Sequence, residues 1–99
     1  MIIKSDCEQP DKVRVRFELP SSLWVDTVYL AGDFNDWNRT SPPLTRHRDD
    51  GTWSITLDLP RGGEYQFRYC TGGGDWHNDS NADKYVPNIY GGHNSVVVT

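Results

Sequence analysis

The sequence contains no long apolar run and only two cysteines. No stretch of its 99 residues approaches the ~20 consecutive apolar residues of a membrane-spanning helix, and the first residues lack the apolar segment of a signal peptide. Cys7 and Cys70 are expected to remain free thiols, because disulfides belong mainly to exported proteins. These absences predict a cytoplasmic protein with no membrane partner and no disulfide framework.

Basic residues are fewer than acidic residues. The chain has 10 Lys and Arg residues against 14 Asp and Glu residues, which gives a formal net charge of -4. Nucleic acids and anionic membrane surfaces bind clusters of Lys and Arg. The composition therefore argues against a nucleic-acid partner and favours a neutral one.

Helical periodicity is absent, and short segments of alternating apolar and polar residues take its place. Such segments, separated by Gly, Pro, Asn and Asp, are typical of β-strands joined by turns. Strands are expected at residues 12–19, 25–31, 44–46, 53–59, 64–71 and 94–99. Six or seven short strands in about 100 residues predict an all-β protein with an antiparallel β-sandwich fold.

The expected strands form one domain. A chain of this length, with 35% hydrophobic residues, has material for a single modest core. Residues 12–99 are expected to form that domain, whereas the polar residues 1–11 are expected to be a flexible N-terminal leader. Trp24 is expected to pack over a sheet edge. Alternation assigns the following residues to the core: Val13, Val15, Phe17, Val28, Leu30, Trp53, Ile55, Leu57, Tyr65, Phe67, Tyr69, Val96 and Val98.

Segment 28–37 ends an expected strand in a corner rich in Asp and Asn. Gly32 can adopt a positive φ there without steric cost, and the short polar side chains after it can bond nearby backbone amides. The corner should therefore be rigid and should present Trp37. A rigid aromatic side chain loses little entropy when a ligand contacts it. Trp37 is thus a candidate binding residue, with a core-capping role as the alternative, whereas Phe34 is expected to cap the core.

Four further residues form a candidate binding surface. Trp76 follows a glycine-rich segment that is expected to be a flexible loop tip, in a neighbourhood too polar to bury an indole. Gln66 and Arg68 share the outward face of the strand before this loop, and Asn94 begins the last strand. An indole stacks on the C–H face of a sugar ring, while amide and guanidinium groups bond hydroxyls. These residues suit a polyhydroxylated ligand, with a solvated surface cation as the alternative role of Arg68.

The most specific sequence string is Gly-Asp-Phe-Asn-Asp-Trp at residues 32–37. This string, the strand before it, and segments 43–45, 51–53, 57–60, 65–69 and 94–98 resemble the family 48 carbohydrate-binding modules. That family includes the N-terminal early-set domains of isoamylase and glycogen-branching enzyme and the glycogen-binding domain of the AMP-activated protein kinase β subunit. The likeness runs from about residue 13 to residue 99 and implies an immunoglobulin-like, early-set sandwich.

The resemblance also implies a ligand. In the glycogen-binding members, two tryptophans, a basic strand residue and an asparagine near the last strand contact α-1,4-linked glucose. Trp37, Trp76, Arg68 and Asn94 occupy the matching places here. The implied function is non-catalytic binding of glycogen, starch or maltooligosaccharide, as in the short, stand-alone bacterial members. The segment after Trp76 lacks the usual Asp-Pro, and extra glycine precedes it, so a mobile Trp76 and weaker binding are expected.

Two other functions compete with sugar binding. Early-set domains also pack against proteins, so the main alternative is an interaction domain that docks onto a glucan-metabolising enzyme and has lost sugar binding. A glycosidase needs two facing carboxyl groups, one with a raised pKa. The acids near the candidate site are expected in open polar loops, so no catalytic role is predicted for them: Asp33, Asp36, Asp75 and Asp79.

Neither a cofactor nor a metal site is predicted. Acidic and polar side chains alternate in segment 75–83, but a calcium loop that starts at Asp79 would place Lys84 where Gly belongs and Tyr90 where Glu belongs. The three histidines have no zinc-ligand spacing. A single ion bound by a few side chains of segment 75–83 remains an open alternative.

Overall fold

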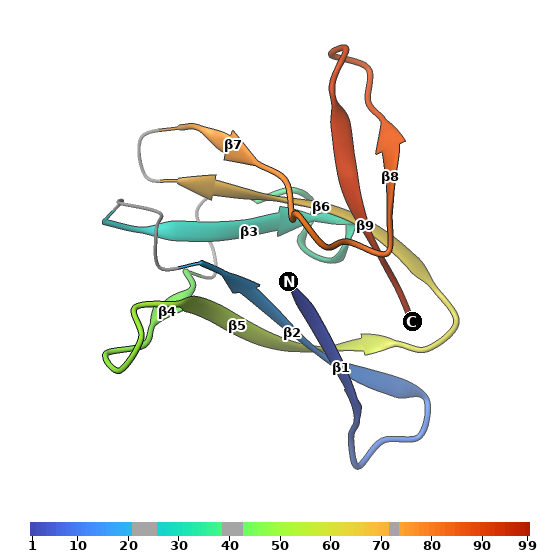
Figure 1. Cartoon of the computed structure of the whole chain (residues 1–99). Coiled ribbons are helices and arrows are strands. Elements are labelled where there is room, and N and C mark those ends of the chain that lie inside the picture. Colours follow the sequence, from blue (N-terminus) through green and yellow to red (C-terminus); the bar gives the residue numbers. More distant parts are fainter. Residues whose placement is uncertain (21–25, 39–42, 72–73) are drawn as a thin grey trace.

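The strands form two antiparallel sheets that face each other (Figure 1). The computed structural model describes residues 1–20, 26–38, 43–71 and 74–99, so Trp24 lies outside the described residues. One sheet has the strand order β1-β2-β5-β4; the other has the order β3-β6-β9-β8, with β7 paired to β6. The strands are β1 (Ile2–Asp6), β2 (Lys12–Leu19), β3 (Val28–Gly32), β4 (Thr45–Arg46), β5 (Trp53–Pro60), β6 (Glu64–Thr71), β7 (Trp76–His77), β8 (Lys84–Pro87) and β9 (His93–Val98).

This arrangement confirms the predicted all-β, immunoglobulin-like antiparallel sandwich. The helical content of the described residues is one turn of 3-10 helix, η1, at Asp33–Asn35. None of the described segments forms a helix of the length and apolarity that crossing a membrane requires. The turns at Gly51 and Gly62 have φ values of 74° and 81°, a conformation that glycine adopts without steric cost.

The N-terminal residues differ from their prediction. Residues 2–6 form β1, which pairs with β2 from Ile2 opposite Phe17 to Asp6 opposite Val13. The pairing gives strand partners to backbone groups on this edge of β2, and Ile2 packs against the core. The expected flexible leader is therefore wrong for residues 2–6. The polar composition concealed a strand because only one apolar side chain contributes to the core.

Aromatic side chains fill the space between the sheets. Phe17 meets Phe67 edge to face with ring centroids 5.0 Å apart, and Phe67 meets Tyr69 at 5.7 Å. Such pairs add about 0.5–1.5 kcal/mol to the burial of the rings. Phe34 packs against this cluster, 5.8 Å from Phe17, which confirms its core-capping role. The predicted core residues found buried are Val13, Val15, Phe17, Val28, Leu30, Trp53, Phe67, Tyr69 and Val96, while Ile55, Leu57 and Tyr65 are partly buried against the core.

In the last strand, β9, the face that points toward the core is not the predicted one. Alternation assigns Val96 and Val98 to the core, yet Val97 is the residue of β9 that pairs with Tyr65 and joins the core cluster. Val97 is fully buried, whereas Val98 is 37% exposed. Three consecutive valines carry no period, so their faces are decided by the register with β6.

Gly32 brings β3 into close contact with β6. A Cβ at this position would lie 2.6 Å from the Gln66 carbonyl oxygen and 2.9 Å from the Phe67 Cβ. The φ of Gly32 is -171°, so Gly32 does not use the positive φ that is open to glycine, and close approach of the two backbones explains the residue instead. Positive φ values occur instead at Asp36 (56°) and Trp37 (58°).

Replacing Gly32 should therefore destabilise the fold. In Gly32→Ala the added methyl group would push β3 away from β6, and overpacking of this kind costs about 1–3 kcal/mol of unfolding free energy. Urea unfolding measures this cost. Gly92→Ala is the matched control, because the nearest atom to a Cβ there is 3.4 Å away. Equal stability of the two variants would contradict the close-approach explanation.

Candidate functional site

The outer face of the sheet that contains β6 collects four of the predicted site residues. Gln66 and Arg68 share this face, because strand residues two positions apart point the same way. The pairing of β6 with β9 places Asn94 on the same face. The pairing of Cys70 with Trp76 adds the Trp76 side chain. Segments far apart in the sequence therefore meet here through strand register.

Trp37 reaches this face through the corner after β3. Its indole Nε1 donates to Asp33 Oδ1 at 3.0 Å, and Asp33 Oδ2 accepts from the backbone N–H of Gln66 at 2.8 Å. One carboxylate thereby ties the indole to β6. Asp36 and Trp37 both have a positive φ, which costs about 1–3 kcal/mol at a non-glycine residue. Strain of this kind concentrates at functional sites, where surrounding contacts hold it in place.

The indoles of Trp37 and Trp76 form a tryptophan pair. Their ring centroids lie 6.5 Å apart and their planes are inclined by 55°. The guanidinium carbon of Arg68 lies 5.8 Å from the centroid of the Trp76 ring, within the range of a cation–π contact. Both indoles are half-buried, so packing restrains each ring while part of its surface stays accessible.

Trp76 lies in a strand that the sequence analysis did not predict. Trp76 opens β7 and pairs with Cys70 of β6. Just before β7, the Thr71 N–H donates to the Asp75 carbonyl at 2.9 Å. Trp76 thus begins a short strand, β7, which the sequence analysis did not predict. The sequence concealed this because β7 has only two residues, too few to show alternation.

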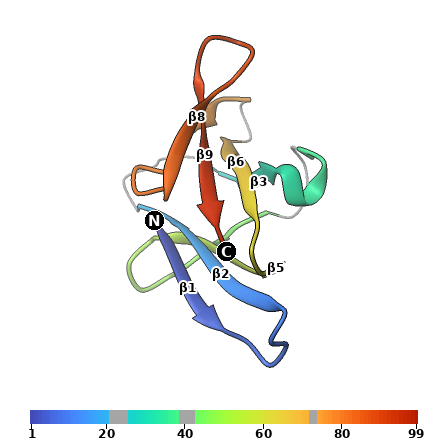
Figure 2. The ribbon, with the colours of Figure 1, turned by 90° about the vertical axis from the view of Figure 1, so that its right-hand side faces the viewer.

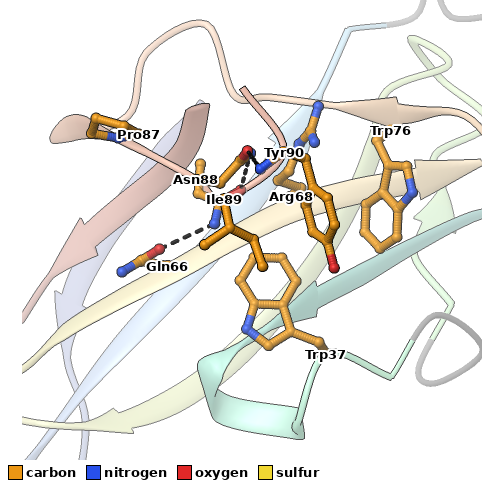
Figure 3. Close-up of a pocket in the computed structure, with 9 residues that line it drawn as sticks. Trp37, Gln66, Arg68, Trp76, Pro87, Asn88, Ile89 and Tyr90 are labelled. Carbon is orange, nitrogen blue, oxygen red and sulfur yellow. Dashed lines mark hydrogen bonds between the residues drawn. The ribbon is translucent and has the colours of Figure 1, made fainter. Parts of the chain in front are cut away.

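A groove of about 1080 Å³ runs over this face (Figure 3). Its described lining contains one charged side chain, Arg68. All five residues predicted for the site line the groove: Trp37, Gln66, Arg68, Trp76 and Asn94.

The other wall of the groove comes from the β8–β9 hairpin, which sequence reasoning missed. This hairpin projects beyond the other strands (Figures 1 and 2). Ile89 and Tyr90 at its tip are 90% and 89% exposed. The signal present in the sequence was two large apolar residues within an Asn- and Gly-rich segment, where they are expected to be exposed. The hairpin residues that line the groove are Pro87, Asn88, Ile89 and Tyr90.

A buried carboxylate anchors the segment between β7 and β8. Asp79 is 1% exposed, and its Oδ2 accepts from the Tyr69 hydroxyl at 2.8 Å and from the Met1 ammonium group at 2.7 Å. Burial, followed by the charge of Asp79, raises the pKa of Tyr69 and keeps its hydroxyl protonated as a donor. The open, solvated position predicted for Asp79 is therefore wrong, because these partners compensate the burial of its charge.

Side chains of segment 75–83 form ion pairs and hydrogen bonds with other parts of the domain. Asp83 pairs with Lys4 at 2.7 Å and accepts from the Val98 N–H at 2.7 Å. Asn78 accepts from the Ser95 N–H at 3.1 Å, which ties the segment to β9. Across the described ranges, no group of three or more His, Cys, Asp or Glu side chains is placed to hold a metal ion.

Comparison with known protein families identifies the class of this groove-bearing domain. Residues 8–86 match the family model of carbohydrate-binding module 48, the isoamylase N-terminal domain. The chain belongs to this family. The family 48 assignment agrees with the resemblance seen in the sequence and with the sandwich fold.

Three relatives of this family 48 module are much longer proteins. It is 39% identical over 66 residues to an alpha-amylase of Niallia circulans. It is 48% identical over 54 residues to a 1,4-alpha-glucan-branching enzyme of Dictyostelium discoideum, and 32% identical over 73 residues to one of Halothermothrix orenii. These matches cover 65%, 54% and 70% of this chain but only 5%, 7% and 11% of the relatives.

The role of Asp33 as a bridge can be tested directly. Asp33→Asn offers one oxygen to two N–H donors and turns an NH2 group toward one of them, so one hydrogen bond is lost. We expect the Trp37 indole N–H or Gln66 backbone N–H signal to shift in 15N NMR spectra, with about 1 kcal/mol lost from the unfolding free energy. Asp36→Asn is the control, because it removes the same charge at an exposed position of the same corner. Unchanged signals in Asp33→Asn would contradict the bridge.

Proposed function

We propose that this family 48 module binds α-1,4-linked glucan, such as glycogen, starch or maltooligosaccharide, without cleaving it. The observation that carries the proposal is the tryptophan pair beside a row of side-chain amides in one groove. The family is carbohydrate-binding, and two relatives are named for 1,4-alpha-glucan. The assignment of Trp37, Trp76, Arg68, Asn94 and Gln66 to the sugar is part of the proposal.

The tryptophan pair supplies the apolar contribution to binding. Each indole face removes C–H surface of a sugar ring from water, at about 25 cal/mol per Å². Sugar units in an α-1,4-linked chain turn relative to one another, so two inclined rings can each meet a sugar face. The bond from Trp37 to Asp33 and the strand position of Trp76 limit the entropy that the rings lose on binding.

Polar groups of the groove supply hydrogen bonds to a neutral ligand. Arg68, Gln66 and Asn94 carry N–H donors that match sugar oxygens. The described lining offers no carboxylate pair of the kind that glycoside hydrolysis uses. This lining supports binding rather than cleavage as the function of the groove. The cytoplasmic location stays a prediction.

The alternative function is docking onto a glucan-metabolising enzyme or another protein. The same face, with Ile89 and Tyr90 exposed, would then contact protein instead of sugar. Glycogen pull-down by the pure module distinguishes the two functions. Retention on glycogen supports sugar binding, and passage of the folded module through glycogen without retention favours docking.

Affinity should be divided unequally among the site residues. Trp37→Ala and Trp76→Ala should each weaken maltoheptaose binding by about 5- to 150-fold, since a well-placed Trp contributes about 1–3 kcal/mol. Arg68→Ala should have a smaller effect, because its hydrogen bonds to a neutral sugar contribute on the order of 1 kcal/mol. Titration calorimetry measures the ranking. Moderate salt should change the affinity little, because the ligand has no charge to screen.

Two controls accompany this ranking. Trp53→Ala should lower the melting temperature through loss of core packing, and melts of every variant verify that each is folded. Incubation with maltoheptaose should release no shorter sugars. Full binding by folded variants that lack both site tryptophans would refute the sugar platform, and steady chain shortening by the pure module would refute the non-catalytic function.

A further inference from the structure

We propose that Asn88 is a positioning residue, which sets the direction of a chain of side-chain amides so that Gln66 offers N–H donors to the ligand. The proposal rests on the sugar-binding function of the groove. The chain runs from Asn88 in the hairpin through Asn94 of β9 to Gln66 of β6. Figure 3 labels its two ends, Asn88 and Gln66. We refer to these three side chains as the amide relay.

The backbone of the hairpin fixes the orientation of the first amide. Asn88 Oδ1 lies 2.9 Å from the Tyr90 backbone nitrogen and 3.1 Å from the Gly92 backbone nitrogen. A backbone N–H only donates, so the atom facing both must be the acceptor oxygen. The Asn88 Nδ2 group therefore has to point the other way. This settles an amide orientation that heavy-atom positions alone leave ambiguous.

The orientation then passes along the relay. Asn88 Nδ2 donates to Asn94 Oδ1 at 3.2 Å, which leaves Asn94 Nδ2 to face Gln66. Asn94 Nδ2 donates to Gln66 Oε1 at 3.1 Å. With its oxygen turned toward Asn94, Gln66 directs the two N–H groups of Nε2 toward a ligand or water. Two hairpin N–H groups thus decide which atoms Gln66 presents.

This direction affects what the groove accepts. Ring and glycosidic oxygens of a sugar only accept hydrogen bonds, whereas hydroxyls both donate and accept. An amide held with its N–H groups outward can bond either kind of oxygen. A reversed amide would present an acceptor, which a ring or glycosidic oxygen cannot satisfy. A fixed amide also loses less entropy on binding than one that rotates freely.

The amide relay lies in a half-buried position beside the groove. Asn88, Asn94 and Gln66 are each half-buried, so water competes less for their bonds than at a fully exposed site. Gln66 and Asn94 both line the groove with the tryptophan pair. Asn88 lines the opposite wall, so it links the hairpin position to the polar groups of the sheet. Its role is exerted through Asn94 and Gln66.

The test separates hairpin support from relay direction. In Asn88→Asp, the carboxylate still accepts from Tyr90 and Gly92, but it cannot donate to Asn94. The Asn94 amide should then turn to donate to the new carboxylate, which reverses the orientation of Gln66. We expect maltoheptaose binding to weaken by about 2- to 10-fold, the range for loss of one hydrogen bond. Asn88→Ala loses both functions and should bind at least as weakly.

A second readout needs no ligand. In the free protein, the side-chain NH2 signals of Gln66 should shift in Asn88→Asp and also in Asn88→Ala, which adds no charge. Asn81→Asp is the control for added negative charge at an exposed asparagine and should leave these signals and the affinity unchanged. Unshifted Gln66 signals in both Asn88 variants would overturn the relay. Shifted signals with wild-type affinity in Asn88→Asp would overturn its positioning role.

These readouts keep the two proposals separable. If the wild-type module bound no maltoheptaose, the proposed function would fail, while the Gln66 signals would still decide whether the relay exists. If the wild-type module bound and the Asn88 variants bound equally well, the sugar-binding function would stand and the positioning role of Asn88 would be refuted.

Discussion

The groove depends on how closely β3 approaches β6 at Gly32. A Cβ atom at this position would lie 2.6 Å from the Gln66 carbonyl oxygen. Because glycine has no side chain, β3 can stay paired with β6 as far as the corner. The corner then closes on itself, because the Trp37 N–H donates to the Gly32 carbonyl at 2.9 Å. Asp33 adds its bridge between the Trp37 indole and the Gln66 N–H. The strained backbone at Trp37 is held by these contacts, and the position of the indole follows from them.

The opposite wall depends on β9. This strand pairs with β6 on one side and with β8 on the other, so it connects the sheet under the tryptophan pair to the projecting hairpin. Asn94 lies at that connection, with Asn88 and Gln66 as its partners. In the proposed site, the tryptophans and the side-chain amides therefore come from different elements. The pairing of β6 with β9 holds these elements together.

The sequence predicted the elements that are determined by local residue patterns. Alternation located β2, β5 and β6, and the Gly-Asp-Phe-Asn-Asp-Trp string located the Trp37 corner. The prediction failed where contacts with residues elsewhere in the chain determine the structure. The polar segment 2–6 becomes a strand through β2, Val97 replaces Val98 in the core through its register with β6, and the carboxylate of Asp79 is buried against Tyr69. The five predicted site residues share one groove, whereas its hairpin wall has no periodic signature.

The central claim is that an α-glucan chain lies on the tryptophan pair. A 15N NMR titration of the labelled module with maltoheptaose tests it most directly, because each indole N–H gives its own signal. The signals of Trp37 and Trp76 should move progressively with ligand, together with the side-chain amides of Gln66 and Asn94, while the buried Trp53 indole stays in place. Saturating ligand with no movement at Trp37 and Trp76, or movement confined to the sheet that contains β1 and β2, would contradict the claim.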